Sequence, residues 1–305
     1  MGNFNAKPCH HTEVHNSHYQ TQPQPQPQPH LSLKINDNYR TYNDVSSALQ
    51  KVGVEKVNLI VGVDFTKSNL WQGKRSFNNR SLHALLEGNQ QNQYQHVISM
   101  IGQTLAPLDA DGLIPVFGFG DLSTEDFSVF PFNSDHSPCK GFNDVLERYQ
   151  TIAKSVTLSG PTSFAPIIEA SINIVQNDGS YHILLIIADG MVDNIKETTD
   201  AIIKASYYPL SIVMIGVGDG PWETMETFDD NIPDRLFDNF QFVNYNKIMG
   251  AENNNPFRFA LHSLMEIPEQ YDYIKKNNLI HSNKNTYTIY PNPQYTTDPS
   301  APPPY

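Results

Sequence analysis

Residues 59–69 read LIVGVDFTKSN, an apolar run that ends on an acidic residue. The run carries no charge before Asp64, as in a strand at the middle of a parallel sheet, where helices cover both faces. Asp64, Thr66 and Ser68 then follow at alternate positions, where the chain leaves the sheet. In open α/β sheets, ligands bind beyond the carboxyl ends of the strands. A carboxylate and two hydroxyls there can converge on one hard cation, so this segment predicts a metal site with oxygen ligands.

Two later segments carry the same kind of signal. The string LSGPTSFAPIIEASINIV places Thr162 just before a helical apolar pattern, and YHILLIIADG places Asp189 at the end of a second apolar strand. Asp121, which closes VFGFGD, is a further carboxylate that can stand behind the direct ligands. Each residue alone also fits a loop carboxylate or a helix cap, and Thr162 with Ser163 could cap the helix that follows. The whole set favours a divalent cation, magnesium or manganese first, with calcium as the remaining candidate.

The chain between residues 39 and 272 alternates apolar strands with helical periodicity, which is typical of crossover units in a parallel sheet. We predict strands at 57–63, 113–119, 183–188, 211–217 and 240–243. We predict helices at 91–105, 142–154, 164–176, 195–206 and 257–265. Right-handed crossovers then give an α/β fold, a doubly wound, mostly parallel sheet flanked by helices. The loops of Asp64, Thr162 and Asp189 lie on one edge of it.

The composition limits the classes of function. The chain has 305 residues and a formal net charge of −12, enough length for one large α/β domain with tails. The acidic balance lacks the basic stripe that phosphate neutralisation needs, so we expect no nucleic-acid binding. Two cysteines, Cys9 and Cys139, are too few for a disulfide framework and suit a reducing compartment. No apolar run of about 18 residues and no signal-peptide core occur, so we expect a cytoplasmic protein, with the nucleus left open.

Two tails flank the predicted domain. Residues 1–38 are rich in His, Gln and Pro and residues 273–305 in Asn, Pro and Tyr, so we expect both to be disordered. The second tail ends in overlapping PSAP and PPPY motifs, which comprise Pro299, Ser300, Ala301, Pro302, Pro303, Pro304 and Tyr305. A PPxY sequence suits WW domains because a polyproline II segment loses little entropy on docking. PSAP resembles the peptides that the ubiquitin-variant domain of the endosomal sorting machinery binds. A solubilising linker is the alternative.

The first tail carries a candidate lipidation signal. Gly2 follows the initiating Met, as in N-myristoylation, but Ala6 stands where Ser or Thr is preferred. One myristoyl chain gives marginal membrane binding, so a peripheral membrane contact needs a second anchor, for which Cys9 is the candidate. The alternatives are an unmodified tail and zinc binding by Cys9 with its neighbouring histidines.

These segments resemble the von Willebrand factor A domains, whose metal-ion-dependent adhesion site is written Asp-x-Ser-x-Ser, then a distant Thr and a distant Asp. The strings NLIVGVDFTKSN, FGFGD, GPTSFAPII, IIADG and GVGDGPW are similar to the copine subgroup. FDDNIPDRLFDNFQFVNY is similar to the A domain of the plant copine-like RING ubiquitin ligases. The resemblance implies that Thr66, Ser68 and Thr162 are hydroxyl ligands, with Thr66 in place of the first Ser. Asp64 and Asp189 then fix waters or coordinate directly, and an acidic residue of a protein partner fills the open position.

Enzyme signatures are missing from the 305 residues. The plant ligases end in a RING domain, which needs about eight Cys and His ligands in close pairs, and the sequence has no such segment. The paired lipid-binding domains of copines do not occur either. GVGDGP lacks the third glycine of a dinucleotide loop, GKRS lacks the spacing of a phosphate loop, and there is no Gly-x-Ser-x-Gly elbow. We therefore predict an intracellular adaptor that is not an enzyme. A ubiquitination factor that acts through a recruited ligase and a passive scaffold are the alternatives.

Overall fold

The computed structural model describes residues 39–281 except residues 55, 89 and 252–254. The predicted first tail, residues 1–38, lies outside the described residues, and so do residues 282–305 of the predicted second tail. The lipidation candidates Gly2 and Cys9 and the PSAP and PPPY motifs lie outside them as well.

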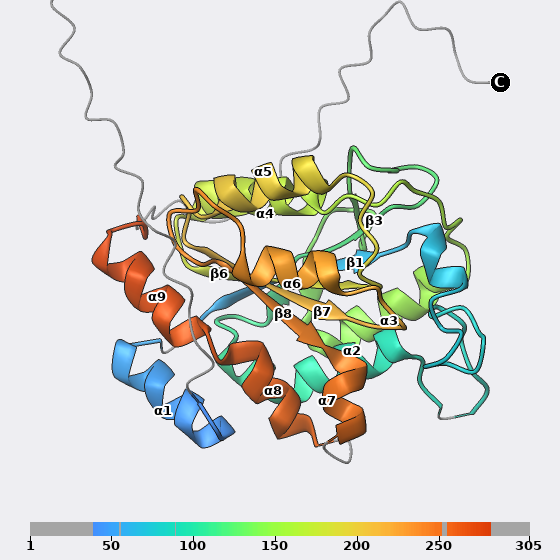
Figure 1. Cartoon of the computed structure of the whole chain (residues 1–305), viewed down its shortest axis with the longest axis horizontal. Coiled ribbons are helices and arrows are strands. Elements are labelled where there is room, and N and C mark those ends of the chain that lie inside the picture. The colour runs from blue at the N-terminus through green and yellow to red at the C-terminus, as the bar shows by residue number, and fades with distance from the viewer. Residues whose placement is uncertain (1–38, 55, 89, 252–254, 282–305) are drawn as a thin grey trace, which may run out of the picture.

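A six-stranded sheet with strand order β4-β3-β1-β6-β7-β8 forms the centre of the described fold (Figure 1). Its strands are β1 (Asn58–Asp64), β3 (Val116–Phe119), β4 (Phe130–Pro131), β6 (His182–Ala188), β7 (Leu210–Gly216) and β8 (Phe240–Asn244). Neighbouring strands are parallel except β3 and the short β4, which are antiparallel. A separate two-stranded ladder joins β2 (Leu113–Ile114) and β5 (Cys139–Lys140).

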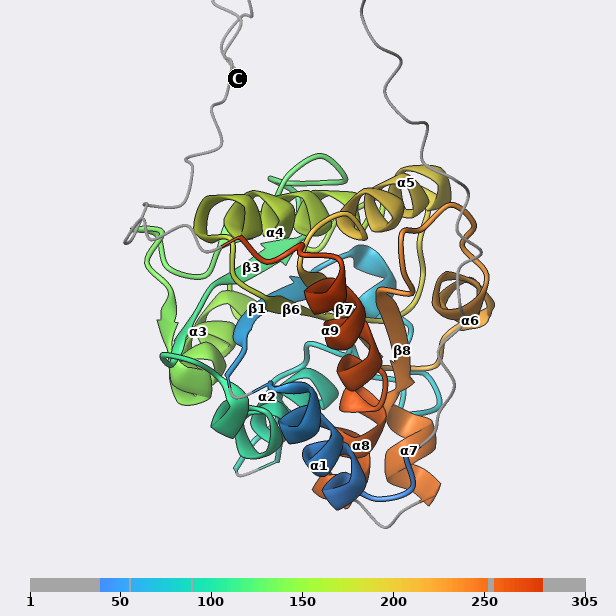
Figure 2. The same ribbon diagram turned by 90° about the vertical axis from the view of Figure 1, so that its left-hand side faces the viewer.

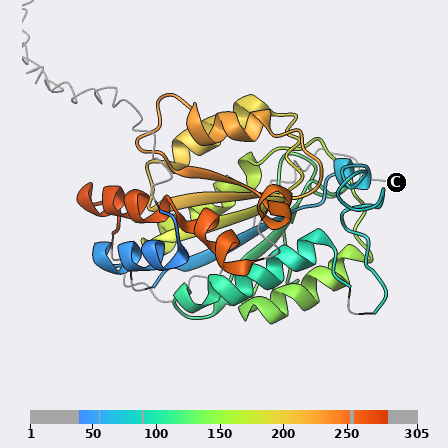
Figure 3. The same cartoon turned by 60° about the horizontal axis from the view of Figure 1, so that its bottom comes forward.

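Helices cover both faces of the sheet (Figure 2). One face packs against α4 (Ala165–Asp178), α5 (Ile195–Ala205) and α6 (Glu223–Asp230). The other packs against α1 (Tyr42–Val52), α2 (Gln93–Thr104), α3 (Gly141–Ala153), α7 (Tyr245–Ala251), α8 (Pro256–Leu264) and α9 (Ile267–Lys276). Figure 3 shows α2 and α3 side by side on this second face. Short 3₁₀ turns, η1 (Lys67–Leu70) and η2 (Ala106–Leu108), follow β1 and α2.

Between their ends the central strands are almost wholly apolar, because both of their faces are buried. In β1, Leu59, Val61 and Val63 belong to one hydrophobic core, while Ile60 belongs to the other. Side chains of a strand alternate between the two faces of a sheet, so a strand covered on both sides favours apolar residues on each face. The predicted fold class, a doubly wound and mostly parallel sheet flanked by helices, is confirmed.

Three details of the prediction were wrong or incomplete. The predicted strand 113–119 is divided at Pro115, which has no N–H for a strand ladder, and only its second half joins the main sheet. Helices α1, α6, α7 and α9 were not predicted. The expected boundary at residue 272 falls inside α9, because Tyr271 and Tyr273 both pack against the core. None of the described helices is long and apolar enough to cross a bilayer.

A buried ion pair gives the first testable prediction. Arg235 Nη1 lies 2.8 Å from Oδ1 of Asp238, and each residue is 2% exposed. Removing one partner leaves the other charge buried without compensation, so Asp238→Ala should lower the free energy of unfolding by about 3–5 kcal/mol in urea denaturation. The matched control is Asp200→Ala, which breaks the exposed pair with Lys196 and should leave the midpoint nearly unchanged. Equal urea midpoints for Asp238→Ala and Asp200→Ala would contradict a stabilising role of the buried pair.

Candidate metal centre

The carboxyl ends of β1 and β6 meet where the crossovers reverse direction. From β1 the chain moves to β3 on one side, and from β6 it moves to β7 on the other. Asp64 ends β1, and Asp189 directly follows β6. The backbone nitrogen of Asp189 lies 3.5 Å from Oδ2 of Asp64. The two predicted carboxylates therefore lie side by side at the topological switch point, the usual ligand position in this kind of sheet.

The loop after β1 brings two hydroxyls to these carboxylates. The Thr66 N–H donates to Oδ1 of Asp64 over 2.7 Å, and the hydroxyl oxygens of Thr66 and Ser68 are 2.9 Å apart. Against the larger effect of burial, the Ser68 hydroxyl lowers the pKa of the Asp189 carboxyl group, and the Asp189 N–H lies 3.5 Å from Oδ2 of Asp64. Gly120 permits this arrangement, because a Cβ at its φ of +78° would come within 2.2 Å of Thr66 Cγ2. Four of the five predicted ligands therefore form one hydrogen-bonded cluster.

Thr162 is joined through its backbone to the loop that follows β6. Its N–H donates to Oδ2 of Asp193 over 2.8 Å, and its carbonyl accepts from the Asp193 N–H over 2.9 Å. Asp193 lies in the loop that begins with Asp189. The hydroxyl of Ser163 accepts from the N–H of Ala165 at the start of α4, so Ser163, and not Thr162, supports the helix start. The Thr162 hydroxyl has no recorded hydrogen bond to the other four predicted ligands in the described chain.

Asp121 is engaged within its own loop. Its carboxylate accepts hydrogen bonds from the hydroxyls of Ser123 and Thr124 and from the Thr124 N–H. These contacts hold the loop that follows β3. They do not bring the Asp121 carboxylate into contact with the cluster around Asp64, so within the described chain its predicted role behind the metal ligands has no hydrogen-bond support.

The carboxyl groups of Asp64 and Asp189 are fully buried and lack a compensating charge. Burial raises the pKa of Asp64 above its ordinary value. Burial, and then the charge of Asp64, raise the pKa of Asp189 to about 8. No basic side chain of the described chain forms an ion pair with either carboxylate, and Oδ2 of Asp189 is buried without a hydrogen-bond partner there. Two such groups are stable together when a proton or a cation neutralises them.

The donor set fits a hard divalent cation. Among the described residues, no group of three or more His, Cys, Asp and Glu side chains is placed to hold a metal, so hydroxyls have to complete this site. Two carboxylates and several hydroxyl oxygens match the preference of magnesium, manganese or calcium for oxygen. The residues that would hold the ion are Asp64, Thr66, Ser68, Thr162 and Asp189. A bound ion would neutralise the carboxylates and present positive charge to an incoming anionic group.

Residues beneath the loop hold it in place, and the sequence analysis missed them. Asn69 Nδ2 donates to the Thr66 carbonyl over 3.1 Å, and Asn69 Oδ1 accepts from the Tyr94 hydroxyl over 2.7 Å. His83 Nε2 donates to the Asp64 carbonyl over 2.8 Å, and burial lowers the pKa of His83 to about 3, so the ring is neutral. Asn69 could have been found, because it directly follows Ser68 in the sequence. No local pattern points to His83.

A doubly wound sheet with two aspartates and neighbouring hydroxyls at its switch point defines an α/β domain of the von Willebrand factor A type. The profile of the copine family matches residues 81–283. The chain belongs to the copine family.

Two curated relatives and one solved structure are similar to this chain. The E3 ubiquitin-protein ligase RGLG2 of Arabidopsis thaliana is 51% identical over 263 residues, covering 81% of this chain and 56% of the relative. Copine family protein 2 of Caenorhabditis elegans is 47% identical over 246 residues, covering 80% of this chain and 3% of the relative. The crystal structure of the manganese-loaded TRAP protein of Plasmodium vivax has a TM-score of 0.40 at 14% identity, covering 67% of this chain and 74% of that one. The chain thus spans little more than half the length of the plant ligase.

Charge repulsion between the aspartates gives the second prediction. Asp189→Asn removes one of the two charges but keeps the acceptor for the Met191 N–H, which lies 3.1 Å from Oδ1. In the presence of a chelator, the variant should melt about 2–4 °C above the unsubstituted protein, the shift that about 1 kcal/mol gives in a domain of this size. Millimolar magnesium or manganese should raise the melting temperature of the unsubstituted protein only.

Differential scanning fluorimetry with and without chelator measures both effects. Asp200→Asn, which changes an exposed aspartate on α5, is the matched control and should behave as the unsubstituted protein under both conditions. An Asp189→Asn variant that is less stable in chelator and is still stabilised by magnesium would contradict the assignment.

Proposed function

We propose that this chain is a metal-dependent protein-binding adaptor whose candidate metal centre binds an acidic residue of a partner. The observation that carries the proposal is the buried, uncompensated pair of Asp64 and Asp189 beside the hydroxyls of Thr66 and Ser68. A cation held partly by neutral hydroxyls is not fully neutralised and attracts a further anionic ligand. A carboxylate of a protein partner supplies such a ligand. Magnesium or manganese is the ion that we favour, with calcium as the remaining candidate.

The surface around the centre supports a protein as the ligand. Several large apolar residues are exposed on the loops that follow β1, β3 and β6 and at the start of α5, namely Leu70, Trp71, Leu122, Phe127 and Ile195. These loops share the edge of the sheet on which the metal centre lies. Exposed apolar side chains around a polar anchor are typical of protein-binding surfaces.

The two tails would determine which membrane and which proteins the adaptor contacts in the cytoplasm. We propose peripheral membrane contact through lipidation at Gly2 and Cys9. The PSAP and PPPY motifs would contact endosomal sorting proteins and WW-domain proteins. This part of the proposal rests on the sequence of the tails alone.

Partner capture gives the third prediction. Thr162→Ala removes a hydroxyl ligand but keeps both backbone hydrogen bonds to Asp193, so the fold should persist. Both this variant and chelation should weaken binding of at least one partner about tenfold or more, which is about 1.4 kcal/mol. Affinity capture with magnesium or with chelator, followed by quantification of the bound proteins, measures the effect.

The control for that experiment is Thr151→Ala, which changes an exposed hydroxyl on α3. It should leave every captured protein unchanged. Capture that resists both chelation and Thr162→Ala would contradict a metal-dependent adaptor and would favour a passive scaffold.

A ubiquitination factor is the second candidate function. Its support is the 51% identity to RGLG2, whose name is that of an E3 ubiquitin-protein ligase. The 305 residues contain two cysteines and no RING pattern, so the chain would act by recruiting a WW-containing ligase through the motif that ends on Tyr305.

Deletion of residues 302–305 tests this second candidate. The deletion should lower the ubiquitination of bound clients severalfold and leave client binding unchanged, because the motif recruits the ligase and not the client. A reconstituted assay with a WW-containing ligase measures both quantities, and Thr162→Ala, which should lower both, is the matched comparison. Unchanged ubiquitination after the deletion would remove this candidate.

A further inference from the structure

A groove lies beside the metal centre, between the loop after β1 and the loop after β7. Its volume is about 650 Å³, within the range of sites for small ligands and short peptides. Trp71 and Trp222 both line it, and they are the only tryptophans of the sequence. An indole ring offers a large apolar face and one N–H donor, so two indoles in one groove can bind a ligand that has apolar surface and hydrogen-bond acceptors.

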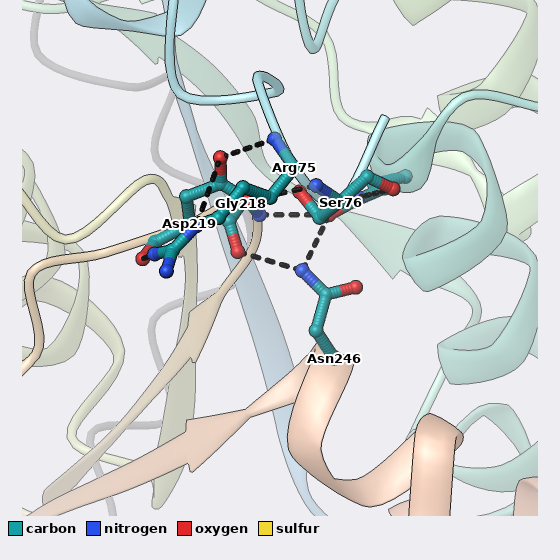
Figure 4. A network of polar contacts seen from close by, with 6 residues as sticks. Arg75, Ser76, Gly218, Asp219 and Asn246 are labelled. Carbon is teal, nitrogen blue, oxygen red and sulfur yellow. Dashed lines mark hydrogen bonds and ion pairs between the residues drawn. The ribbon is translucent and has the colours of Figure 1, made fainter. Parts of the chain in front are cut away.

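The two loops are fixed to each other by hydrogen bonds (Figure 4). The Asp219 carboxylate accepts the backbone N–H groups of Arg75 and Ser76 over 2.7 Å and 2.8 Å. The carbonyl of Gly218, the residue before Asp219, accepts from Asn246 Nδ2 over 2.6 Å. The walls of the groove are therefore preformed, and a ligand would not bear the entropy cost of ordering them.

Trp222 is the fixed wall of the groove and Trp71 is the exposed one. The Trp222 ring packs 5.3 Å from the ring of Phe242. It also lies so close to Gly190 and Gly216 that a Cβ at either would come within 2.4 Å of it. Trp71 is 51% exposed. Neither indole N–H donates to another residue of the described chain, so both remain available to a ligand's carbonyl oxygen.

The charges of the groove nearly cancel. Its cations are Lys74 and Arg75. Its anions are Glu223, Glu226 and Asp219, and Arg75 Nε lies 3.9 Å from the Asp219 carboxylate. Such a lining does not select a strongly charged ligand. Two indoles with available N–H groups instead suit a polyproline II segment, whose rings stack on aromatic faces and whose carbonyls have no internal partners.

We propose that this groove binds the proline-rich tail of the same chain, residues 291–305. The tail carries six prolines, namely Pro291, Pro293, Pro299, Pro302, Pro303 and Pro304. Its one charged side chain is Asp298, which complements Lys74 at the groove. The other proline-rich segment, residues 22–29, has no charged side chain to match.

The tail is long enough to reach the groove. The described fold ends at His281, whose N–H donates to the Gly179 carbonyl, at the edge of the sheet opposite to the groove. The central strands have seven residues, so they span about 23 Å between the two edges. The 17 residues between His281 and Pro299 make 18 Cα–Cα steps, which can span about 55–65 Å.

Docking in the groove also covers the PPPY motif, so a WW domain has to compete with the groove for the same prolines. This regulation goes beyond metal-dependent binding and does not depend on it. It makes the accessibility of the motif a property of the folded domain.

Tryptophan fluorescence tests the proposal directly, because the two tryptophans of the chain report on the groove. The full chain is compared with a full-length variant that carries Pro302→Ala, Pro303→Ala and Pro304→Ala. The acrylamide quenching constant should rise about twofold in the variant, because the exposed indole is no longer covered. A synthetic peptide of residues 291–305, added to the variant, should restore the lower value. The same peptide with the three alanines is the matched control and should have no effect.

Trp71→Ala in the full chain provides a second variant, chosen because Trp71 is exposed and Trp222 is packed. With Trp71 absent, the remaining fluorescence should no longer respond to the proline substitutions. Equal quenching of the full chain and the triple variant would overturn the proposal. Protection that grows with protein concentration would also overturn it, since a second copy would then supply the tail. A chelator in every sample keeps the result independent of the metal centre. A negative result here would therefore not contradict the proposed metal-dependent binding. A negative result in the metal-dependent capture experiment would likewise not contradict docking of the tail in the groove.

Discussion

Two carboxylates, Asp64 and Asp189, are buried beside each other at the switch point of the sheet. Desolvation makes each charge costly, and their mutual repulsion adds to the cost. A fold can keep such a pair only if its surroundings hold the groups rigidly until a proton or cation neutralises them. Asn69 and His83 contribute to that rigidity, because they donate hydrogen bonds to the backbone carbonyls of Thr66 and Asp64.

The sequence predicted this pair because the relevant signals are local. An apolar run such as residues 59–63 marks a buried strand, and its first polar residue marks the edge of the sheet. At Asp121 the same signal stays a prediction, because the hydroxyls of Ser123 and Thr124 engage its carboxylate within its own loop. His83 reaches Asp64 only through the folded chain. Contacts of that kind depend on packing between distant segments, and no spacing in a single sequence encodes them.

Membership of the copine family does not by itself give the function of this chain. The copine match extends over residues 81–283, so it includes Thr162 and Asp189 but leaves out β1 with Asp64, Thr66 and Ser68. The ligase RGLG2 matches over 56% of its own length, and the activity in its name belongs to that whole protein. What this domain contributes by itself has to follow from its own surface chemistry. The uncompensated aspartates, the neighbouring hydroxyls and the exposed apolar loops are the features on which the proposed binding function rests.

The metal centre and the tryptophan groove share their supporting loops. The backbone N–H of Trp71 donates to the Ser68 carbonyl over 3.0 Å, and the Trp222 ring packs against Gly190, the residue after Asp189. A segment that presses on either indole therefore acts on a loop that carries a proposed metal ligand. Coupling between two sites is reciprocal in free energy, so any effect of the docked tail on metal affinity must equal the effect of the metal on tail docking.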